Sequence, residues 1–434
     1  MDNKMMLRAP AVPLITVDPY FSVWSNTDRL NDSDPVHWTG KPNTICGVVE
    51  IDGKDYRFMG TGGGEPLTQT SLDITTMTTT YTFEGAGIKL TARFFTPLFM
   101  DDLKIMTRPV SYLEVKAEPV DGSTHSLKLK LYASEELCLD KRDQYEVVTE
   151  TLDIDGVSAV RIGSKDQPVL EKKGDDIRID WGYFYMAAWC ADVAGYKCTD
   201  TNMNFVMLEK PFEDRVLAVF AYDDIYSINY FGDKLKSVWN HDGKTIETAI
   251  REAFGDYDEL LKKAVEFDAK LWCDAVRAGG EKYAELLQLA YRQVIAAHKA
   301  VVDKDGELLF ISKECFSNGC AATVDVSYPS IPMFLIYNPE LVLGMMRPIF
   351  KYAASDEWKF DFAPHDAGQY PIVTGQVYGS NAESYQMPVE ECGNMLIMTA
   401  AAARASRDYS FAKAHLETLE GWTKYLIEYG VDPA

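Results

Sequence analysis

The chain has 434 residues, of which 47% are hydrophobic, and a formal net charge of −23. This length exceeds what one ordinary core accommodates, so we expect two or three domains, and the apolar content excludes wholesale disorder. Such an acidic surface repels phosphate backbones, which excludes nucleic acid as an expected partner. No run of about eighteen apolar residues is present, so the sequence predicts no membrane span.

The eight cysteines include no C-x-x-C pair, and no Cys/His spacing is typical of a zinc site. We therefore expect no metal centre and no cofactor. Cys315 and Cys320 are close enough in sequence to suggest a disulfide, but we expect free buried thiols. The first ten residues contain no apolar signal-peptide core, which fits a cytosolic protein and equally a mature extracytoplasmic one.

Aromatic residues are dense between residue 1 and about residue 60, as in Pro19–Trp24 and His37–Trp38. Aromatic side chains bury large areas and anchor interfaces, so packing between domains is the first interpretation. The functional alternative is a platform on which a sugar ring stacks.

From Ile45 to about Tyr230 the sequence alternates with period two, as in Ser71–Phe83, which is rich in β-branched and aromatic residues. Gly85-Ala86-Gly87 turns that strand into the next one and predicts a hairpin. The same alternation recurs in Ile88–Phe94, Ser111–Ala117, Leu127–Tyr132, Tyr145–Thr149 and Arg215–Tyr222. Many antiparallel strands with turn signals indicate a β-sandwich, which we assign to residues 1–241.

Near His241 the period changes to that of helices. Lys244–Phe254 and Tyr257–Ala278 are predicted helices, broken at Gly255, and form a helical linker over residues 242–280. Glu281–Val301 is then predicted as one helix. Its apolar stripe, which should face the core, consists of Tyr283, Leu286, Leu287, Ala290, Val294 and Ala297.

Further helices are predicted at Pro339–Ala354, with a kink at Pro348, and at Pro388–Arg404, which begins with a proline. Its segment Met395–Ala403 is apolar on nearly every side, so we expect this helix to be buried all round. Tyr409–Tyr429 is more amphipathic. A very apolar helix followed by an amphipathic one is what the inner and outer layers of a helical barrel would give.

Between these helices, the stretch from Lys313 to Asp366 carries the best candidates for chemistry. Glu314, Asp325, His365 and Asp366 lie in predicted loops that alternate with apolar helical segments. Loops on a rigid scaffold are where catalytic residues usually lie. Glycoside hydrolysis requires two carboxyl groups beside one bond, which this set of residues supplies.

Amide hydrolysis usually requires an activated Ser, Thr or Cys, or a metal-bound water. Ser410 and Lys413 have the S-x-x-K spacing, but Ser410 stands where a helix is predicted to begin, and Cys315 and Cys320 show no partner histidine nearby in sequence. Glu390 and Glu391 fall in the first turn of a helix, where the helix dipole favours acids, so a structural role is expected. If either side chain points into the barrel, it would supply a further carboxylic acid for catalysis.

Several strings resemble the glutaminase A family: Leu7–Leu14, Asp18–Ser25, Lys313-Glu314, Phe316–Gly319, Val324-Asp325, Ala363–Gly368 and Met387–Met395. The resemblance implies an N-terminal antiparallel β-sandwich followed by a six-hairpin (α/α)6 toroid, and hydrolysis of L-glutamine to glutamate and ammonia. It also implies an exported, extracytoplasmic protein. Members continue well past the last residue here, so residues 281–434 would be an incomplete toroid and this chain a fragment.

A more distant likeness is to the glycosylceramidase-type β-glucosidases, which share that toroid. In those enzymes a glutamate precedes an Asp-Val pair by eleven residues, and a Pro-His-Asp sequence follows further on. Here Glu314 precedes Asp325 by eleven residues, and His365 is the histidine of a Pro-His-Asp sequence. The likeness implies that Glu314 is the nucleophile and that Asp325, His365 and Asp366 hold sugar hydroxyls. Nothing here matches the acid/base aspartate of those enzymes.

We therefore expect a hydrolase that acts on a small polar substrate, glutamine or a glycoside. Glu314 and Asp366 are the catalytic candidates, and Asp325, His365, Glu390 and Glu391 are the candidates for substrate binding. A glycan-binding module with an inert toroid is the alternative. The hydrolase hypothesis requires Glu314, Asp325, His365 and Asp366 to converge within about 10 Å, the scale on which carboxyl pairs span a sugar.

Overall fold

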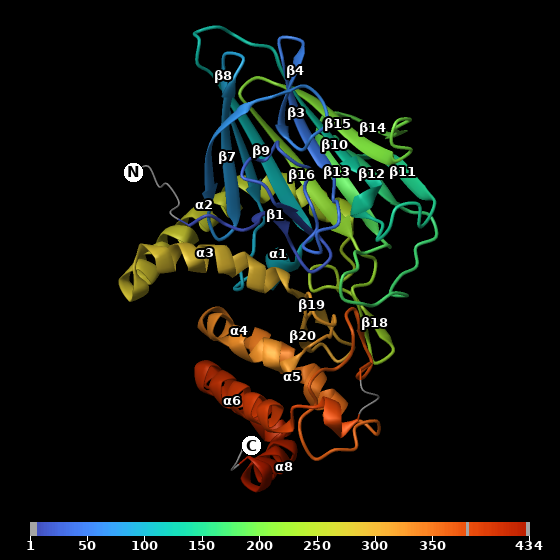
Figure 1. The fold of residues 1–434 in the computed structure, drawn as a ribbon, viewed down its shortest axis with the longest axis vertical. Coiled ribbons are helices and arrows are strands. Elements are labelled where there is room, and N and C mark those ends of the chain that lie inside the picture. The colour runs from blue at the N-terminus through green and yellow to red at the C-terminus, as the bar shows by residue number, and fades with distance from the viewer. Residues whose placement is uncertain (1–6, 379–381, 431–434) are drawn as a thin grey trace.

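The computed structural model describes residues 7–378 and 382–430, so the predicted limits at residues 1 and 434 lie outside the described residues. In Figure 1 a β-sandwich forms the upper part of the molecule, and a stack of helices forms the lower part. This is the predicted fold class, with antiparallel sheets first and a helical region after them. Among the described helices, none is both long enough and apolar enough to cross a bilayer.

Two large sheets make up the sandwich. The first has the order β14-β15-β10-β3-β4-β5, with β3 (Ile45–Ile51), β4 (Lys54–Met59), β5 (Glu65–Pro66), β10 (Leu127–Ser134), β14 (Asp192–Lys197) and β15 (Asn204–Phe212). The second has the order β11-β12-β13-β16-β9-β8-β7-β6, with β6 (Thr68–Ile74), β7 (Thr78–Gly85), β8 (Ile88–Phe95), β9 (Val110–Pro119), β11 (Val147–Ile154), β12 (Val157–Ser164), β13 (Tyr183–Trp189) and β16 (Arg215–Asp223). The short strands β1 (Val12–Thr16) and β2 (Ser22–Ser25) pair with each other and form a separate two-stranded sheet.

Strand β8 shows why the alternation predicted this architecture. Its residues Ile88, Leu90 and Ala92 are buried in the sandwich, while the residues between them are more exposed. The predicted hairpin is present, because β7 and β8 pair down to Gly85 and Ile88. The single strand predicted over Ser71–Phe83 is wrong, since a turn divides it into β6 and β7.

Helix α2 (Ile246–Gly279) runs unbroken for 34 residues, so the predicted break at Gly255 is wrong. A glycine inside a helix costs about 1 kcal/mol relative to alanine. Here Ala253 and Tyr257, on either side of Gly255, are buried against the sandwich and stabilise the helix. Gly280 caps the C-terminal end of the helix, and its φ of 86° suits glycine.

Helix α3 (Glu281–Ala296) is shorter than predicted, because the chain continues as strand β19 (His298–Val302), which pairs with β20 (Leu308–Ser312). The predicted apolar stripe faces the core only in part: Leu287 and Val294 pack against it, whereas Tyr283 and Leu286 are 43% and 55% exposed. Arg292 is buried instead and donates hydrogen bonds to the carbonyls of Thr75 and Thr78. A buried cation with backbone partners has set the orientation of this helix.

The remaining helices are α4 (Val324–Tyr337), α5 (Pro339–Ala353), α6 (Pro388–Ser406), α7 (Ser410–Ala414) and α8 (Leu416–Tyr429). In Figure 1, α3, α4, α6 and α8 follow one another down the stack, and α6 contacts α4, α5 and α8. These neighbours cover only part of α6. Ile397 is 51% exposed, so the prediction of a helix buried all round is wrong within the described residues.

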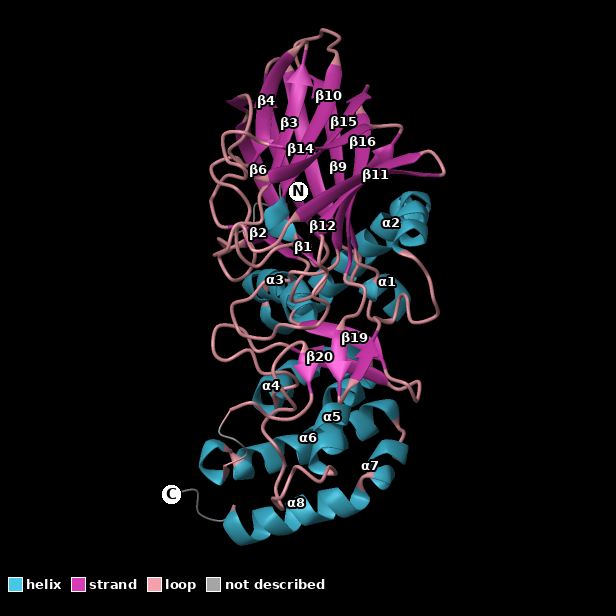
Figure 2. Ribbon diagram, turned by 90° about the vertical axis from the view of Figure 1, so that its right-hand side faces the viewer, coloured by secondary structure: helices cyan, strands magenta, loops and turns pink. Residues whose placement is uncertain are grey.

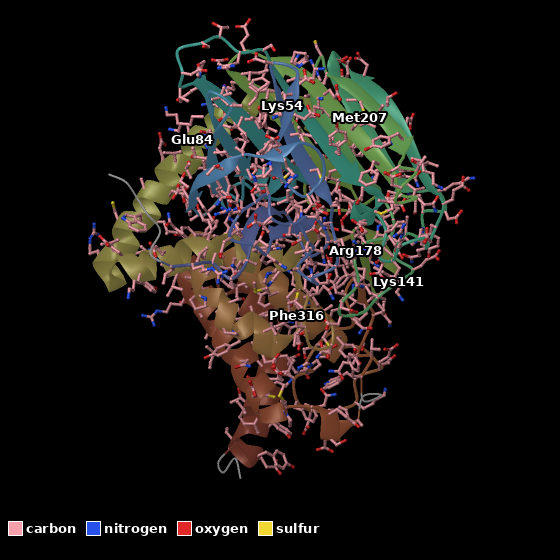
Figure 3. All side chains as sticks on the ribbon, turned by 45° about the horizontal axis from the view of Figure 1, so that its top comes forward. Lys54, Glu84, Lys141, Arg178, Met207 and Phe316 are labelled. Carbon is pink, nitrogen blue, oxygen red and sulfur yellow. The ribbon has the colours of Figure 1, made fainter. Side chains whose placement is uncertain are left out.

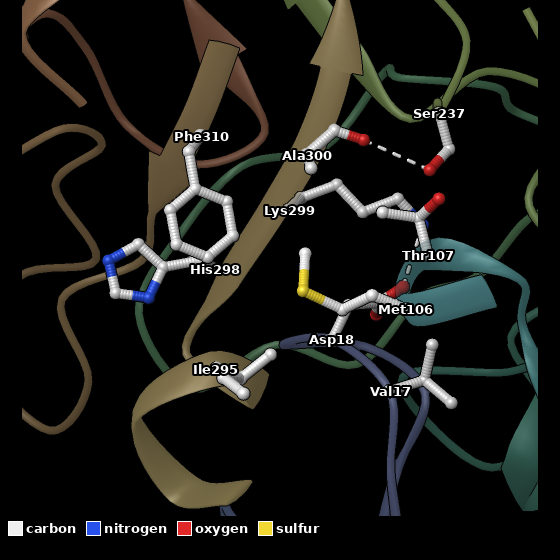
Figure 4. Close-up of a pocket in the computed structure, with 10 residues that line it drawn as sticks. All are labelled: Val17, Asp18, Met106, Thr107, Ser237, Ile295, His298, Lys299, Ala300 and Phe310. Atoms are coloured by element: carbon white, nitrogen blue, oxygen red, sulfur yellow. Dashed lines mark hydrogen bonds and ion pairs between the residues drawn. The ribbon is translucent and has the colours of Figure 1, made fainter. Parts of the chain in front are cut away.

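A buried ion pair joins the strand pair β19–β20 to the sandwich, and Figure 2 shows these strands between α3 and α4. Lys299, which is 5% exposed, has Nζ 2.6 Å from Asp18 Oδ2 and 2.8 Å from Asp224 Oδ2. Figure 4 shows the cavity beside Lys299, which Met106 and Phe310 also line. Its volume of about 10 Å³ admits no substrate.

Candidate active site

Two loops and the first turn of α4 carry the candidate site: residues 313–323, between β20 and α4, and residues 362–370, which follow α5. Asp325, predicted to lie in a loop, is in that first turn of α4. Backbone hydrogen bonds tie the loops together. Ala321 N–H donates to Gly368 O at 2.9 Å, and Ala367 N–H donates to Ala321 O at 3.0 Å. Residues that lie far apart in sequence are thereby brought to one place.

His365 is the centre of the site. Its Nδ1 lies 2.9 Å from Asp366 Oδ2, and its Nε2 lies 3.7 Å from Asp325 Oδ1, so the imidazole stands between two carboxylates. Burial lowers the pKa of His365, but the hydrogen bond and charge of Asp366, with the charges of Glu391 and Asp325, raise it overall to about 9. The ring is therefore an imidazolium at neutral pH.

Glu314 lies close to both Asp325 and His365. One carboxyl oxygen of each residue and one ring nitrogen of His365 all lie within 4.8 Å of one another. Burial raises the pKa of Asp325, the charge of His365 lowers it, and the charge of Glu314 raises it further. The structure therefore brings together the four predicted residues Glu314, Asp325, His365 and Asp366.

Of the two glutamates at the start of α6, one joins this group. Glu391 is fully buried, and neither carboxyl oxygen has a hydrogen-bond partner of ordinary geometry in the described part of the chain. Burial raises its pKa to about 8, against the opposing charge of His365. Glu391 therefore keeps its proton to a higher pH than an exposed glutamate does, whereas Glu390 is exposed and does not join the cluster.

Sequence reasoning overlooked Asn318, which fixes the position of Glu314. Its Nδ2 donates to Glu314 Oε1 at 3.1 Å, and its Oδ1 accepts the Cys320 N–H at 2.7 Å. Its carbonyl oxygen accepts hydrogen bonds from Gln369 Nε2 at 2.7 Å and Tyr378 OH at 2.8 Å. The Asn-Gly dipeptide at 318–319 marks a turn, which is the signal that could have identified this residue.

Cys320 does have a histidine nearby, contrary to the sequence expectation. Its Sγ lies within 4.8 Å of one ring nitrogen of His365 and one carboxyl oxygen of Asp366. A Cys-His-Asp arrangement suggests a nucleophile, but burial and the charges of Asp366 and Glu314 raise the pKa of this thiol far above neutrality. Only a thiolate attacks, so Cys320 is a poor nucleophile here. Cys315 and Cys320 are both free thiols, as expected, but only Cys320 is buried, while Cys315 is half-buried.

Two sets of donor atoms are compact enough to hold a divalent cation, Cys320–His365–Asp366 and Glu314–Asp325–His365. Both sets use His365, and a histidine must lose the proton on a nitrogen before that nitrogen binds a metal. Acidic clusters of this kind are also common without an ion, so the geometry by itself assigns none.

The β-sandwich forms one side of the site. Lys313 is buried, and its Nζ donates to Gly174 O at 2.6 Å, in the loop that precedes β13. A Cβ added to Gly319, which has φ 73°, would lie 2.6 Å from the same oxygen. The loop that carries Glu314 therefore rests directly on the sandwich.

The aromatic residues near the N-terminus occupy two kinds of position, in the core and at the edge of the candidate site. Tyr20 and Phe21 are buried in the core, which is the packing role. Trp38 lies at the edge of the site, with its ring 5.1 Å from Phe316 in an edge-to-face arrangement. Figure 3 places Phe316 where the helical part meets the sandwich, and its side chain is 72% exposed.

Comparisons with known proteins agree with the fold described above. The model of the glutaminase A six helical-hairpin domain matches residues 280–434. Two domains of unknown function match the sandwich, DUF4964 over residues 1–67 and DUF5127 over residues 77–210 and 201–274. Together these matches run from the first residue to the last.

Two curated relatives are similar to the chain. A glutaminase A of Aspergillus oryzae is 27% identical in an alignment 480 residues long, and this alignment includes 98% of this chain and 68% of the relative. A probable glutaminase of Arthroderma benhamiae is 23% identical over 467 residues, which cover 90% of this chain and 52% of that relative. The chain thus spans about two thirds of one relative and about half of the other.

Proposed function

This chain belongs to the glutaminase A family, and we propose that the loops 313–323 and 362–370 form the core of a hydrolase active site. The observation that carries the proposal is the position of His365 between Asp325 and Asp366, with Glu314 beside Asp325. An imidazolium beside carboxylates supplies an acid and a base within reach of one substrate atom, which is what general acid–base hydrolysis needs.

The first candidate reaction is deamidation of glutamine, which the names of both relatives suggest. In this reaction Glu314 accepts a proton from a water molecule, and the water oxygen bonds to the amide carbon. The C–N bond then breaks as His365 Nε2 gives its proton to the departing nitrogen, which leaves as ammonia. The proton on Glu314 returns to His365 and restores the site. Asp366 holds the imidazolium through Nδ1 throughout.

The second candidate is hydrolysis of a glycoside, and the spacing of the acids favours it. Oxygens of Glu314 and Asp325 lie within 4.8 Å of each other. Retaining glycosidases have carboxyl groups about 5–5.5 Å apart, whereas inverting enzymes need about 6.5–9.5 Å.

Both candidates are tested by one set of assays on the wild-type chain. Release of ammonia from L-glutamine and release of nitrophenol from p-nitrophenyl β-glucoside report the two reactions. His365→Gln keeps the size and polarity of the side chain without its proton chemistry, so kcat should fall by about 10²–10⁴-fold on whichever substrate reacts. A wild-type chain inert on both substrates, or an unchanged kcat in His365→Gln, would overturn the proposal.

A further inference from the structure

We propose that three aromatic side chains, Trp38, Phe316 and Tyr378, bind a ring-bearing group of the substrate next to the bond that is cleaved. We call these three side chains the aromatic rim. The inference rests on the proposed hydrolase function and extends it, because it names the class of substrate: one whose leaving group carries a neutral six-membered ring, sugar or aryl.

The rim is attached to the loop that holds the catalytic carboxylate. Phe316 follows Glu314 by two residues, which places their Cα atoms within about 7 Å of each other. The Tyr378 hydroxyl donates to Asn318 O at 2.8 Å, and Asn318 in turn donates to Glu314 at 3.1 Å. A substrate bound at Glu314 therefore has aromatic side chains beside it.

The rim is held in place before any ligand arrives. Trp38 Nε1–H donates to Pro19 O at 2.8 Å, and Lys313 Nζ lies 5.5 Å from the centre of the Trp38 ring. The ring of Phe316 stands at 88° to that of Trp38. Rings fixed in this way lose little freedom on binding, which favours affinity.

Phe316 has features that core packing does not explain. Its φ is 61°, a left-handed conformation that is rare for a bulky residue, and its side chain is 72% exposed. The Glu314 N–H donates a hydrogen bond to Cys320 O at 2.9 Å, and this bond closes the loop that contains Phe316. The fold thus holds a strained backbone and an apolar ring in solvent beside the acids, as expected where a ligand covers the ring.

The test compares ligands that differ by one ring, bound to the Glu314→Gln variant and measured by calorimetry. The pairs are γ-glutamyl-p-nitroanilide against L-glutamine, and p-nitrophenyl against methyl β-glucoside; in each pair only the first ligand has a ring in its leaving group. In at least one pair, the ring-bearing ligand should bind more tightly. Adding Phe316→Gly, which suits φ 61°, should weaken that ligand by about 3- to 10-fold, the scale of one aromatic contact, and leave its ring-free partner unchanged.

Tyr283→Ala on α3, another exposed ring, serves as the control and should change no dissociation constant. The proposal of an aromatic rim would be overturned by either of two results. The ligands with a ring in the leaving group could bind no better than their partners, or Phe316→Gly could weaken both members of a pair equally. Binding is measured without turnover, so these results are separate from those on hydrolysis. In the active enzyme Phe316→Gly should raise KM with little change in kcat, whereas loss of the hydrolase site lowers kcat.

Discussion

His365 and Asp366 are neighbours in the chain and partners through their side chains, with Nδ1 2.9 Å from Oδ2. The second oxygen of Asp366 accepts the Gly368 N–H at 2.9 Å, which fixes the carboxylate and, through it, the ring. The opposite nitrogen of His365 is left facing Asp325 and Glu314. This pair sets both the orientation and the charge of the imidazole.

Asp366→Asn tests that pair. The amide keeps an oxygen for Gly368 but removes the negative charge that raises the pKa of His365 to about 9. The pKa of His365 should therefore fall toward its ordinary value of about 6.5, as measured by NMR titration of the ring protons. Asp361→Asn, an exposed acid in the same segment, is the control. A pKa that stays near 9 in Asp366→Asn would assign the shift to another group.

Glu391 should make the stability of the fold depend on pH. Its pKa is raised from 4.5 to about 8, so the folded chain holds this proton more tightly than the unfolded chain. The resulting stabilisation is complete below about pH 4.5 and is lost as the pH rises through about 8. One pKa unit corresponds to about 1.4 kcal/mol, so the loss amounts to a few kcal/mol.

Glu391→Gln, which is neutral at every pH, should remove that dependence. Between about pH 5 and pH 9, the Tm of the wild-type chain should fall relative to that of the variant. The matched control is Glu390→Gln, whose side chain is exposed and whose Tm should follow the wild type. Parallel curves for Glu391→Gln and the wild type would show that this carboxyl group is ionised in the folded protein.

Gly319→Ala should displace the loop that carries Glu314. The new Cβ would lie 2.6 Å from Gly174 O, a backbone atom, in addition to the strain at φ 73°. We expect a loss of about 2–4 kcal/mol in the free energy of unfolding and a fall in kcat. Gly306→Ala is matched, since its φ is 84° and no atom lies within 4 Å of its added Cβ. Equal losses in the two variants, measured by denaturant unfolding, would exclude the contact with Gly174.

Lys299→Met should destabilise the joint between the strand pair and the sandwich. It leaves Asp18 and Asp224 facing each other without the buried cation between them. Breaking a buried pair in this way costs about 3–5 kcal/mol. Lys270→Met removes an exposed pair with Asp274 and should cost less than about 1 kcal/mol. Similar Tm values for the two variants would contradict a structural role for Lys299.

The sequence predicted the sandwich because strands such as β8 alternate strictly, and one face of each must be buried. It failed where long-range partners decided the outcome. Arg292 is buried and donates hydrogen bonds to carbonyls more than two hundred residues away, and part of the predicted hydrophobic stripe of α3, Tyr283 and Leu286, is exposed. Gly255 breaks no helix, because its neighbours pack on the sandwich.

At the site, the spacing of Glu314, Asp325 and His365 in the sequence identified residues that the structure brings together. It did not reveal Cys320 beside His365, because loops 313–323 and 362–370 meet only in three dimensions. Nor did it separate Glu390 from Glu391. A rotation of about 100° per residue around the helix leaves one in solvent and the other in the core.

The most direct test of the central claim is the kcat/KM of Glu314→Gln on the substrate that the wild-type chain hydrolyses. The reference is Glu340→Gln, whose carboxylate pairs with Arg347 on α5 away from the site. The proposal predicts a fall of at least about 100-fold for Glu314→Gln, with an unchanged Tm, and wild-type kcat/KM for the reference. Equal kcat/KM values for the two variants would show that the cluster around His365 is not the hydrolytic site.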